Sequence, residues 1–325
     1  MSKGDGADIL LHWAMAHKIS ELLFAAEESG CLAALARGAS FDDLAQVTGW
    51  RRESLAVVLQ VLSRIRLLDC RDEIYQLVPA AVRYLPLVGI ERQLYDWHLA
   101  HDSLRRALGF EQVSDPLDSL HDPAFMQQFA EAMGATARET ALRIRKIVRP
   151  AGRSVFADLG GADGSVAVEL ASALPEATFR VLDRPTLQEA FNARLVASGV
   201  GDRVRFVPGD LRDLGLVKSV VAGADVIMLL NVAHLLPSEV IDGLLRSTRE
   251  AAKRGAILVV RELFRVEEGP FGLTDFLVID WLKYGARFRD DVSQFIERLC
   301  RAGFTAPRGR SLPDSPDTFV TATVE

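Results

Sequence analysis

Asp158-Leu159-Gly160-Gly161-Ala162-Asp163-Gly164 is the stretch that decides the fold, because it joins a β-rich run at 154–159 to a helical run at 165–174. A glycine-rich turn between strand and helix lets the backbone approach a ligand closely and points N–H groups at it. The turn lacks the spacing of a dinucleotide fingerprint, because Ala162 and Ser165 stand where G-x-G-x-x-G counted from Gly160 requires glycine. It therefore predicts a ligand site that is not built for a pyrophosphate.

Beyond this turn, short β-rich runs alternate with helical ones. Strands are predicted at 154–159, 178–182, 204–207, 225–230 and 256–260, and helices at 165–174, 187–199 and 239–253. Strands that alternate with helices of this length predict a mostly parallel, doubly wound α/β sheet covered on both faces. Such sheets bind ligands beyond the carboxyl ends of their strands.

The first 150 residues are predicted to be helical. From Ile9 to Phe24, apolar residues recur at steps of three and four and predict one continuous buried stripe. A helix is expected at 41–48, between Ser40 and Gly49, followed by a second from Arg51 and a short strand at 74–77. This order is typical of a winged helix. Amphipathic helices are predicted further on, at 94–108 and 123–148.

Charge argues against nucleic acid as a partner. The chain has 325 residues and a net charge of −6, and residues 41–85 hold six Arg, no Lys and six acids. A DNA reader must first neutralise phosphates, and a neutral segment does not. A helical oligomerisation module fits this segment better than a DNA-binding one.

Hydropathy and cysteine usage predict a cytoplasmic protein. No apolar run approaches the ~20 residues that span a bilayer, and the N-terminus lacks the apolar core of a signal peptide. The three cysteines, Cys31, Cys70 and Cys300, lie far apart. They predict neither a zinc motif nor a disulfide framework, so we expect no metal site. His98 and His101 share a helix face but make only half a metal site, and their role stays open.

Three aspartates follow three neighbouring strands. Asp158 ends the first, Asp183 the second, where it could accept both ribose hydroxyls, and Asp210 the third, where it could meet an adenine amine. Acids around one crevice suit a cationic, donor-rich ligand and repel a diphosphate. S-adenosylmethionine, which carries a sulfonium, an ammonium, a ribose and an adenine, fits that charge better than NAD. Alternatively, each aspartate is an ordinary loop-start cap.

Nearly the whole chain resembles the class I S-adenosylmethionine-dependent small-molecule O-methyltransferases, of the plant caffeic-acid type and the bacterial antibiotic-tailoring type. The resemblance is carried by residues 158–164, 181–185, 208–211, 231–234, 259–262 and 301–304. It implies a Rossmann-like methyltransferase domain preceded by an all-α winged-helix dimerisation domain. The expected boundaries are 1–100 for the dimerisation domain, 101–150 for linking helices that line the substrate pocket, and 151–325 for the catalytic domain. The protein is then a homodimer formed through the N-terminal domain.

The resemblance also assigns residues. It implies that His234 is the general base that deprotonates a hydroxyl acceptor and that Glu262 orients its imidazole. It places the cofactor on Asp158, Gly160, Gly161, Asp183, Arg184, Asp210, Leu211 and Asn231. It places the small-molecule acceptor on Phe125, Met126, Phe129, Met133 and Trp281, although a Met/Phe stripe at helical spacing is also typical of plain core.

The sequence departs from the plant pattern at several positions. Ala162 replaces a glycine, Leu235-Leu236 replaces the acid and aromatic that follow the histidine, and Leu230 replaces a lysine. A second acid is missing near Phe288 and Arg289. A bacterial tailoring enzyme acting on an aromatic or polyketide-like metabolite fits best. Alternatives are a family member that binds the cofactor without methylating a hydroxyl, through another reaction or C- or N-methylation, and a ligand-sensing winged-helix regulator. For the two residues themselves, the alternatives are that His234 is a loop histidine with a satisfied hydrogen bond and that Glu262 forms a strand-end salt bridge.

Overall fold

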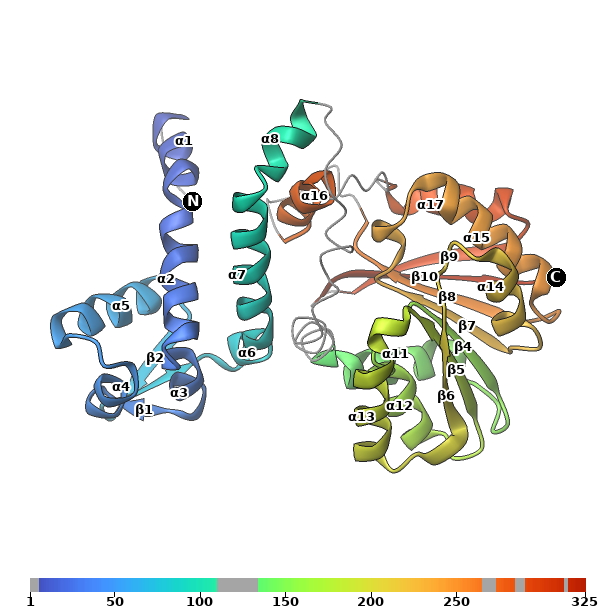
Figure 1. Ribbon diagram of the computed structural model, residues 1–325, viewed down its shortest axis with the longest axis horizontal. Helices are drawn as coiled ribbons and strands as arrows, with labels where there is room; N and C mark the ends of the chain where they lie inside the picture. Colours follow the sequence, from blue (N-terminus) through green and yellow to red (C-terminus); the bar gives the residue numbers. More distant parts are fainter. Residues whose placement is uncertain (1–5, 110–133, 265–272, 284–289, 313–314) are drawn as a thin grey trace. The chain divides into compact units, whose positions relative to one another are not determined.

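The computed structural model describes residues 6–109, 134–264, 273–283, 290–312 and 315–325 (Figure 1). The chain divides into two compact units, Met1–Trp97 and His98–Glu325. Each unit has its own hydrophobic core. The expected three-part division of the chain stays a prediction.

The first unit is mainly helical. Its helices are α1 (Gly6–Met15), α2 (His17–Glu28), α3 (Cys31–Arg37), α4 (Phe41–Thr48), α5 (Arg52–Arg64) and α6 (Pro79–Val82), and α7 (Leu85–Ala100) begins in it. A small antiparallel sheet, which the expected all-α description leaves out, has the order β1 (Ala39–Ser40), β3 (Ile74–Leu77), β2 (Leu68–Arg71).

Local sequence explains where α4 begins and ends. Ser40 and Asp43 form a capping box in which each side chain bonds to the other residue's backbone N–H, and Gly49 ends the helix with a φ of 65°. A capping box satisfies two of the backbone donors that a helix N-terminus leaves open. Leu44, Leu55 and Leu62 are buried beneath α4 and α5, so the expected helix–turn–helix–strand order is confirmed.

The predicted continuous buried stripe at 9–24 is wrong. Two helices meet at Ala16, which lies between α1 and α2. Ile9, Leu10 and Trp13 are exposed, whereas Ile19 and Leu23 on α2 are half-buried. The apolar periodicity was present, but no part of the single described chain covers the face of α1.

The second unit contains a seven-stranded sheet. Its strands are β4 (Val155–Leu159), β5 (Thr178–Asp183), β6 (Val204–Pro208), β7 (Val226–Leu230), β8 (Ile257–Glu262), β9 (Thr305–Leu312) and β10 (Ser315–Thr323). The order is β6-β5-β4-β7-β8-β10-β9. Strands β4 to β8 pair in parallel, and β10 is antiparallel to both of its neighbours. The predicted doubly wound α/β sheet is confirmed.

Helices cover both faces of this sheet (Figure 1). One face carries α11 (Ala137–Val148), α12 (Ser165–Ala173) and α13 (Gln188–Ser198), and the other α14 (Leu214–Val221), α15 (Ser238–Ala251) and α17 (Val292–Arg301). The other helices of the described residues are α8 (Ser103–Leu108), α16 (Leu273–Lys283) and the 3₁₀ turns η1 (Pro185–Leu187), η2 (Gly201–Arg203) and η3 (Ala233–Leu235). Strand residues alternate between the faces: Met228 lies in one core cluster, and Ile227 and Leu229 lie in the other.

The sheet topology positions a ligand site. In chain order β4 is the first strand of the sheet. Strands β5 and β6 lie on one side of it, and β7 and β8, which come later in the chain, lie on the other. Ligands of open α/β sheets bind beyond the carboxyl ends of the strands at such a switch point. The carboxyl ends of β4, β5, β7 and β8 therefore bring Asp158, Asp183, Asn231 and Glu262 to the same edge.

Among the described helices, none is long and apolar enough to cross a membrane.

Candidate active site

The glycine turn after β4 is held by close packing. A side chain at Gly160, where φ is +76°, would place its Cβ 2.6 Å from Val232 Cγ2. A Cβ at Gly161 would lie 2.6 Å from Asp158 Oδ2 and 2.7 Å from Val181 Cγ1. Both distances are too short for any Cβ, so glycine is required at both positions. Gly164, with a φ of 74°, is the N-cap of α12.

Asp183 connects this turn to β5. Its Oδ2 accepts the backbone N–H of Ala162 at 2.8 Å, and its Oδ1 accepts that of Arg184 at 2.7 Å. Ala162 has a φ of 50°, a left-handed conformation that costs an L-residue ~1–2 kcal/mol. The bond to Asp183 holds the alanine in that conformation, which explains how the turn works without the expected glycine.

The three aspartates of the predicted cluster interact electrostatically. Asp158 is 1% exposed and lies against Gly161, and among the described residues neither of its carboxylate oxygens has a hydrogen-bond partner. Burial, with the nearby charge of Asp183, raises the pKa of Asp158 to about 7. Burial also raises the pKa of Asp183, and the charge of Asp210 adds to that rise, against the N–H bonds from Arg184 and Ala162. The strand ends thus gather acceptors and negative charge.

Asn231 extends this acceptor set. It follows β7 with a φ of 55°, a conformation that asparagine tolerates better than most residues. Its backbone N–H donates to the Arg261 carbonyl at 2.7 Å, and its buried Oδ1 has no partner within the described chain. Buried oxygens without donors cost free energy unless a donor-rich group approaches them. Asp158 and Asn231 therefore fit a cationic ligand with several N–H or O–H groups.

The residues beyond β6 differ in exposure. The Asp210 side chain is 49% exposed and accepts the backbone N–H of Arg212 at 2.8 Å. Leu211 is buried in the core, and Arg184 is half-buried after β5. Asp210 is thus at the surface of this edge, where a ligand can reach it.

His234 and Glu262 form a direct pair. His234 lies in η3, and Glu262 is the last residue of β8. The His234 Nδ1 is 2.8 Å from Glu262 Oε1, and the His234 backbone N–H donates to Oε2 at 3.3 Å. The backbone N–H of Leu263 donates to Oε1 at 2.8 Å. The Glu262 side chain is fully buried and that of His234 is 14% exposed, so the predicted pairing of these two residues is present.

The sequence analysis did not predict an ion pair near the glycine turn, between Arg194 and Asp163. Arg194 on α13 donates to Asp163, which also accepts the backbone N–H of Ser165 at 3.1 Å. The Asp163 side chain is 4% exposed. This pair ties the start of α12 to α13 behind the turn. An aspartate just before the Gly-Ser start of a helix is the sequence signal that could have indicated it.

The predicted acceptor residues Phe125, Met126, Phe129 and Met133 lie outside the described residues. Trp281 lies on α16, and its side chain is also outside them. His98 is buried at the end of α7, where burial, and then the charge of Lys283, lower its pKa to about 4. Within the described ranges, no group of three or more His, Cys, Asp or Glu could hold a metal ion.

The buried Asp158 predicts a specific pH dependence of stability. The folded protein keeps the Asp158 proton up to about pH 7, whereas its ordinary pKa is 3.8. The unfolded state therefore binds fewer protons between these values, and this group's contribution to stability is lost as pH rises through that window. Asp158→Asn cannot titrate. Its free energy of unfolding relative to the wild type should rise by on the order of 1 kcal/mol per pH unit.

Urea unfolding of the cofactor-free protein at pH 5 and pH 8 measures this difference. Asp202→Asn removes an exposed carboxylate and controls for the change in net charge. A constant difference between Asp158→Asn and the wild type across the window would show that Asp158 is ionised in the folded protein.

Comparisons with known proteins agree with this geometry. The model of the O-methyltransferase domain family matches residues 106–304. Demethylspheroidene O-methyltransferase of Rhodobacter capsulatus is 25% identical, over 94% of this chain and 78% of the relative. Mitomycin biosynthesis 6-O-methyltransferase of Streptomyces lavendulae is 24% identical, over 83% of this chain and 80% of the relative.

Solved structures share the fold over the full length. Human N-acetylserotonin methyltransferase, solved in complex with SAM, superposes with a TM-score of 0.77 at 20% identity, over 99% of each chain. CalO1, a methyltransferase of calicheamicin biosynthesis solved in its SAH-bound form, gives 0.81 at 19% identity over 100% of each chain. Since the family model matches more than half of the sequence, the chain belongs to the O-methyltransferase domain family.

Proposed function

We propose that this O-methyltransferase transfers a methyl group from S-adenosylmethionine to a hydroxyl of a small aromatic or polyketide-like metabolite, with His234 as general base. The observation that carries the proposal is the His234–Glu262 pair, which lies at the same sheet edge as the aspartate cluster. The relatives' names support the acceptor class, since they include a mitomycin, a naphthoate and a hydroxybenzoate O-methyltransferase.

The acceptor-rich edge supports the cofactor. Asp183 would hold the ribose, Asp210 and Leu211 the adenine, and the turn at Gly160 and Gly161 the amino-acid end. Asp158, Arg184 and Asn231 complete the predicted set. When bound, the cofactor supplies an electrophilic methyl group on a sulfonium. The carboxylates complement that positive charge, and the glycines allow the backbone to approach it.

Glu262 prepares His234 for proton transfer. A buried carboxylate favours a donor opposite it, so the bond to Glu262 Oε1 places the imidazole proton on Nδ1 and the lone pair on Nε2. A phenolic hydroxyl holds its proton until near pH ~10, so a base beside it is needed at neutral pH. Once Nε2 accepts the proton, the negative charge of Glu262 stabilises the imidazolium. A positioned base of this kind contributes ~10²–10⁴-fold to the rate.

Removal of the base should lower turnover and leave cofactor binding intact. We expect His234→Ala to lose at least ~10²-fold in turnover, because the acceptor keeps its proton. Glu262→Gln should also lose turnover, since a neutral amide stabilises the imidazolium less. The assay follows methyl label from S-adenosylmethionine into a panel of hydroxybenzoates and hydroxynaphthoates. Unchanged turnover in His234→Ala would mean that proximity alone carries the reaction, and cofactor binding without label transfer would favour a non-methylating reaction.

The cofactor assignment is tested by calorimetry with S-adenosylmethionine and S-adenosylhomocysteine. Asp183→Asn keeps the size of the side chain but removes its negative charge and replaces one of its two acceptor oxygens by an NH2 donor. We expect at least ~10-fold weaker binding, the equivalent of one lost charge-assisted hydrogen bond. Asp202→Asn is the surface control. Absence of heat with both ligands in the wild type would refute the cofactor assignment.

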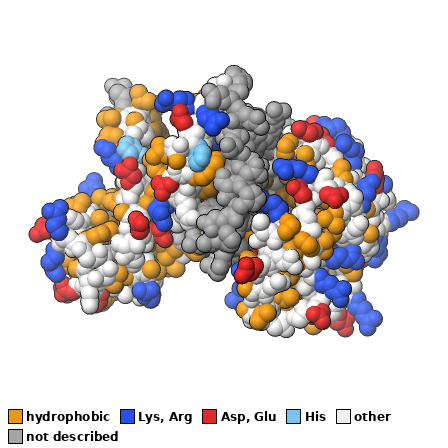
Figure 2. Space-filling model, viewed as in Figure 1, with side chains coloured by type: hydrophobic (Ala, Val, Ile, Leu, Met, Phe, Trp, Pro, Cys, Tyr) orange, Lys and Arg blue, Asp and Glu red, His pale blue; other side chains and the backbone are white. Residues whose placement is uncertain are grey.

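We also propose that two copies of the chain associate through the first unit. Helix α1 exposes Leu10 (74%), Leu11 (59%) and Trp13 (45%), together with Ile9 and Met15. Figure 2 shows hydrophobic side chains on the surface of this helix. Clustered exposed apolar residues are typical of interaction surfaces. The second copy implied by the family resemblance would cover them.

Charges on α1 should therefore separate the dimer. Light scattering after gel filtration should give the mass of two chains for the wild type and of one chain for the double variant Leu10→Glu/Trp13→Glu. The control is Val196→Glu on α13, because Val196 is 85% exposed without belonging to this face. A single-chain mass for the wild type at micromolar concentration would refute the proposed dimer.

The cysteines support a cytoplasmic location. All three are free, with Cys31 buried and Cys70 and Cys300 exposed. Free thiols persist in reducing compartments, whereas extracellular proteins commonly oxidise them.

A further inference from the structure

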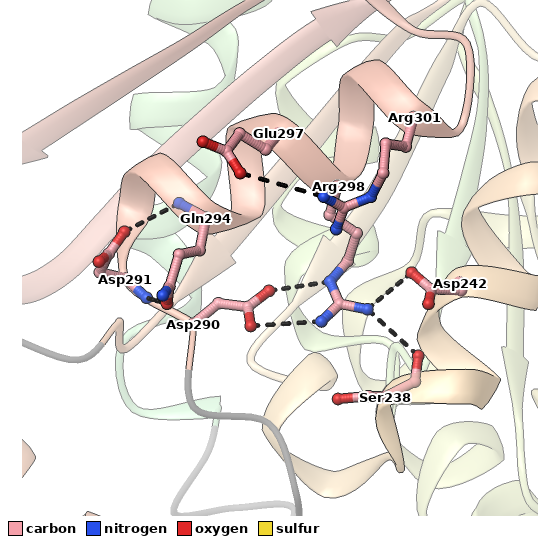
Figure 3. A network of polar contacts seen from close by, with 8 residues as sticks. All are labelled: Ser238, Asp242, Asp290, Asp291, Gln294, Glu297, Arg298 and Arg301. Atoms are coloured by element: carbon pink, nitrogen blue, oxygen red, sulfur yellow. Dashed lines mark hydrogen bonds and ion pairs between the residues drawn. The ribbon is translucent and has the colours of Figure 1, made fainter.

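A buried arginine joins helices α15 and α17 (Figure 3). The Arg298 side chain, on α17, is 9% exposed. Its Nε and Nη2 donate to the two carboxylate oxygens of Asp290, at 2.8 Å and 3.2 Å. Its Nη1 donates to Asp242 Oδ1 at 2.6 Å and to the backbone carbonyl of Ser238 at 3.3 Å. One guanidinium therefore links the start of α17 to the first turns of α15.

The carbonyl that Arg298 holds is close to the base in the chain. Ser238 is the first residue of α15 and follows His234 by four residues, through Leu236 and Pro237. At its other end the same turn is held by Glu262, which bonds both the backbone N–H and the ring of His234. The short segment 234–238 is thus fixed from two separate elements, β8 and α17.

We propose that Arg298 is a positioning residue for His234: it fixes the start of α15, and with it the angle at which the imidazole meets Glu262. The inference rests on the proposed role of His234 as base. The planar fork of arginine satisfies Asp290, Asp242 and the carbonyl together, which the single ammonium of lysine cannot do. Without the fork, at least one of these three acceptors loses its donor. A misplacement of about 1 Å at a reacting group can cost ~10²-fold in rate.

The decisive variant is Arg298→Lys, which keeps the charge and loses the fork. A matched control is Arg301→Lys on the same helix, because the Arg301 side chain is 67% exposed and pairs with Glu297 alone among the described residues, at 4.0 Å (Figure 3). The readout is the imidazole N–H signal of His234 in protein labelled with ¹⁵N-histidine and saturated with S-adenosylhomocysteine. The chain has six histidines, and His234→Gln identifies the signal. Glu262→Gln shows how the signal changes when the bond to the ring is altered.

In Arg298→Lys we expect the Nδ1–H of His234 to exchange with water about tenfold faster, because the turn opens locally more often. Arg301→Lys should keep the wild-type signal, and the affinity for S-adenosylhomocysteine should stay within about threefold in both variants, since neither residue lies in the predicted cofactor set. In the label-transfer assay Arg298→Lys should lower kcat rather than raise KM.

An unchanged His234 signal in folded Arg298→Lys overturns the proposal, as does an equal change in Arg301→Lys. If Arg298→Lys does not fold, Asp242→Asn, which keeps the Asp290 pair, decides by the same comparison. The signal is measured without an acceptor, so it separates the two ideas. A responsive signal with no label transfer in the wild type supports the link from Arg298 to the orientation of His234 and favours a reaction other than the proposed methyl transfer.

Discussion

The buried carboxylate of Glu262 is the constraint on which the active edge depends. An ionised carboxylate without access to water costs several kcal/mol unless donors compensate it. Glu262 is fully buried and is compensated by two backbone N–H groups and the Nδ1 of His234. Two of these three donors belong to one residue of the turn after β7. The carboxylate therefore holds both the backbone and the ring of that residue, and a shift of the turn would break these contacts.

A second acid at the same edge is buried without such donors. Asp158 is as buried as Glu262 but lacks donors among the described residues, and its pKa rises to about 7. The two carboxylates, which composition alone would treat alike, thus differ in the donors around them. Glu262 has the contacts of a carboxylate that three donors hold. Asp158 has those of a group near neutrality, whose ionised form a cationic ligand would favour.

Regular patterns in the sequence predicted most of the fold. Alternating strands and helices predicted the sheet because buried parallel strands read as short apolar runs, and Ser40 and Gly49 marked the ends of α4 within a residue. The prediction of a buried stripe on α1 was wrong, because periodicity shows that a helix face is apolar but does not show what covers that face. Arg298 was beyond prediction, because its partners Asp242 and Asp290 are 56 and eight residues away and no spacing rule joins them.

Of the two leucines that follow His234, Leu236 holds the turn by packing. Leu235 and Leu236 stand where plant members of the resembling family carry an acid and an aromatic, and Leu236 is buried in the same core cluster as Leu244 of α15. Burial of a leucine contributes about 1.5–3 kcal/mol, so Leu236 anchors the turn by packing where a polar residue would anchor it by hydrogen bonds. The polar support of the imidazole then comes through Glu262, and the direction of the turn comes from Leu236 and the start of α15. A histidine supported in this way keeps its orientation through contacts within the chain, which fits the role of base proposed for it.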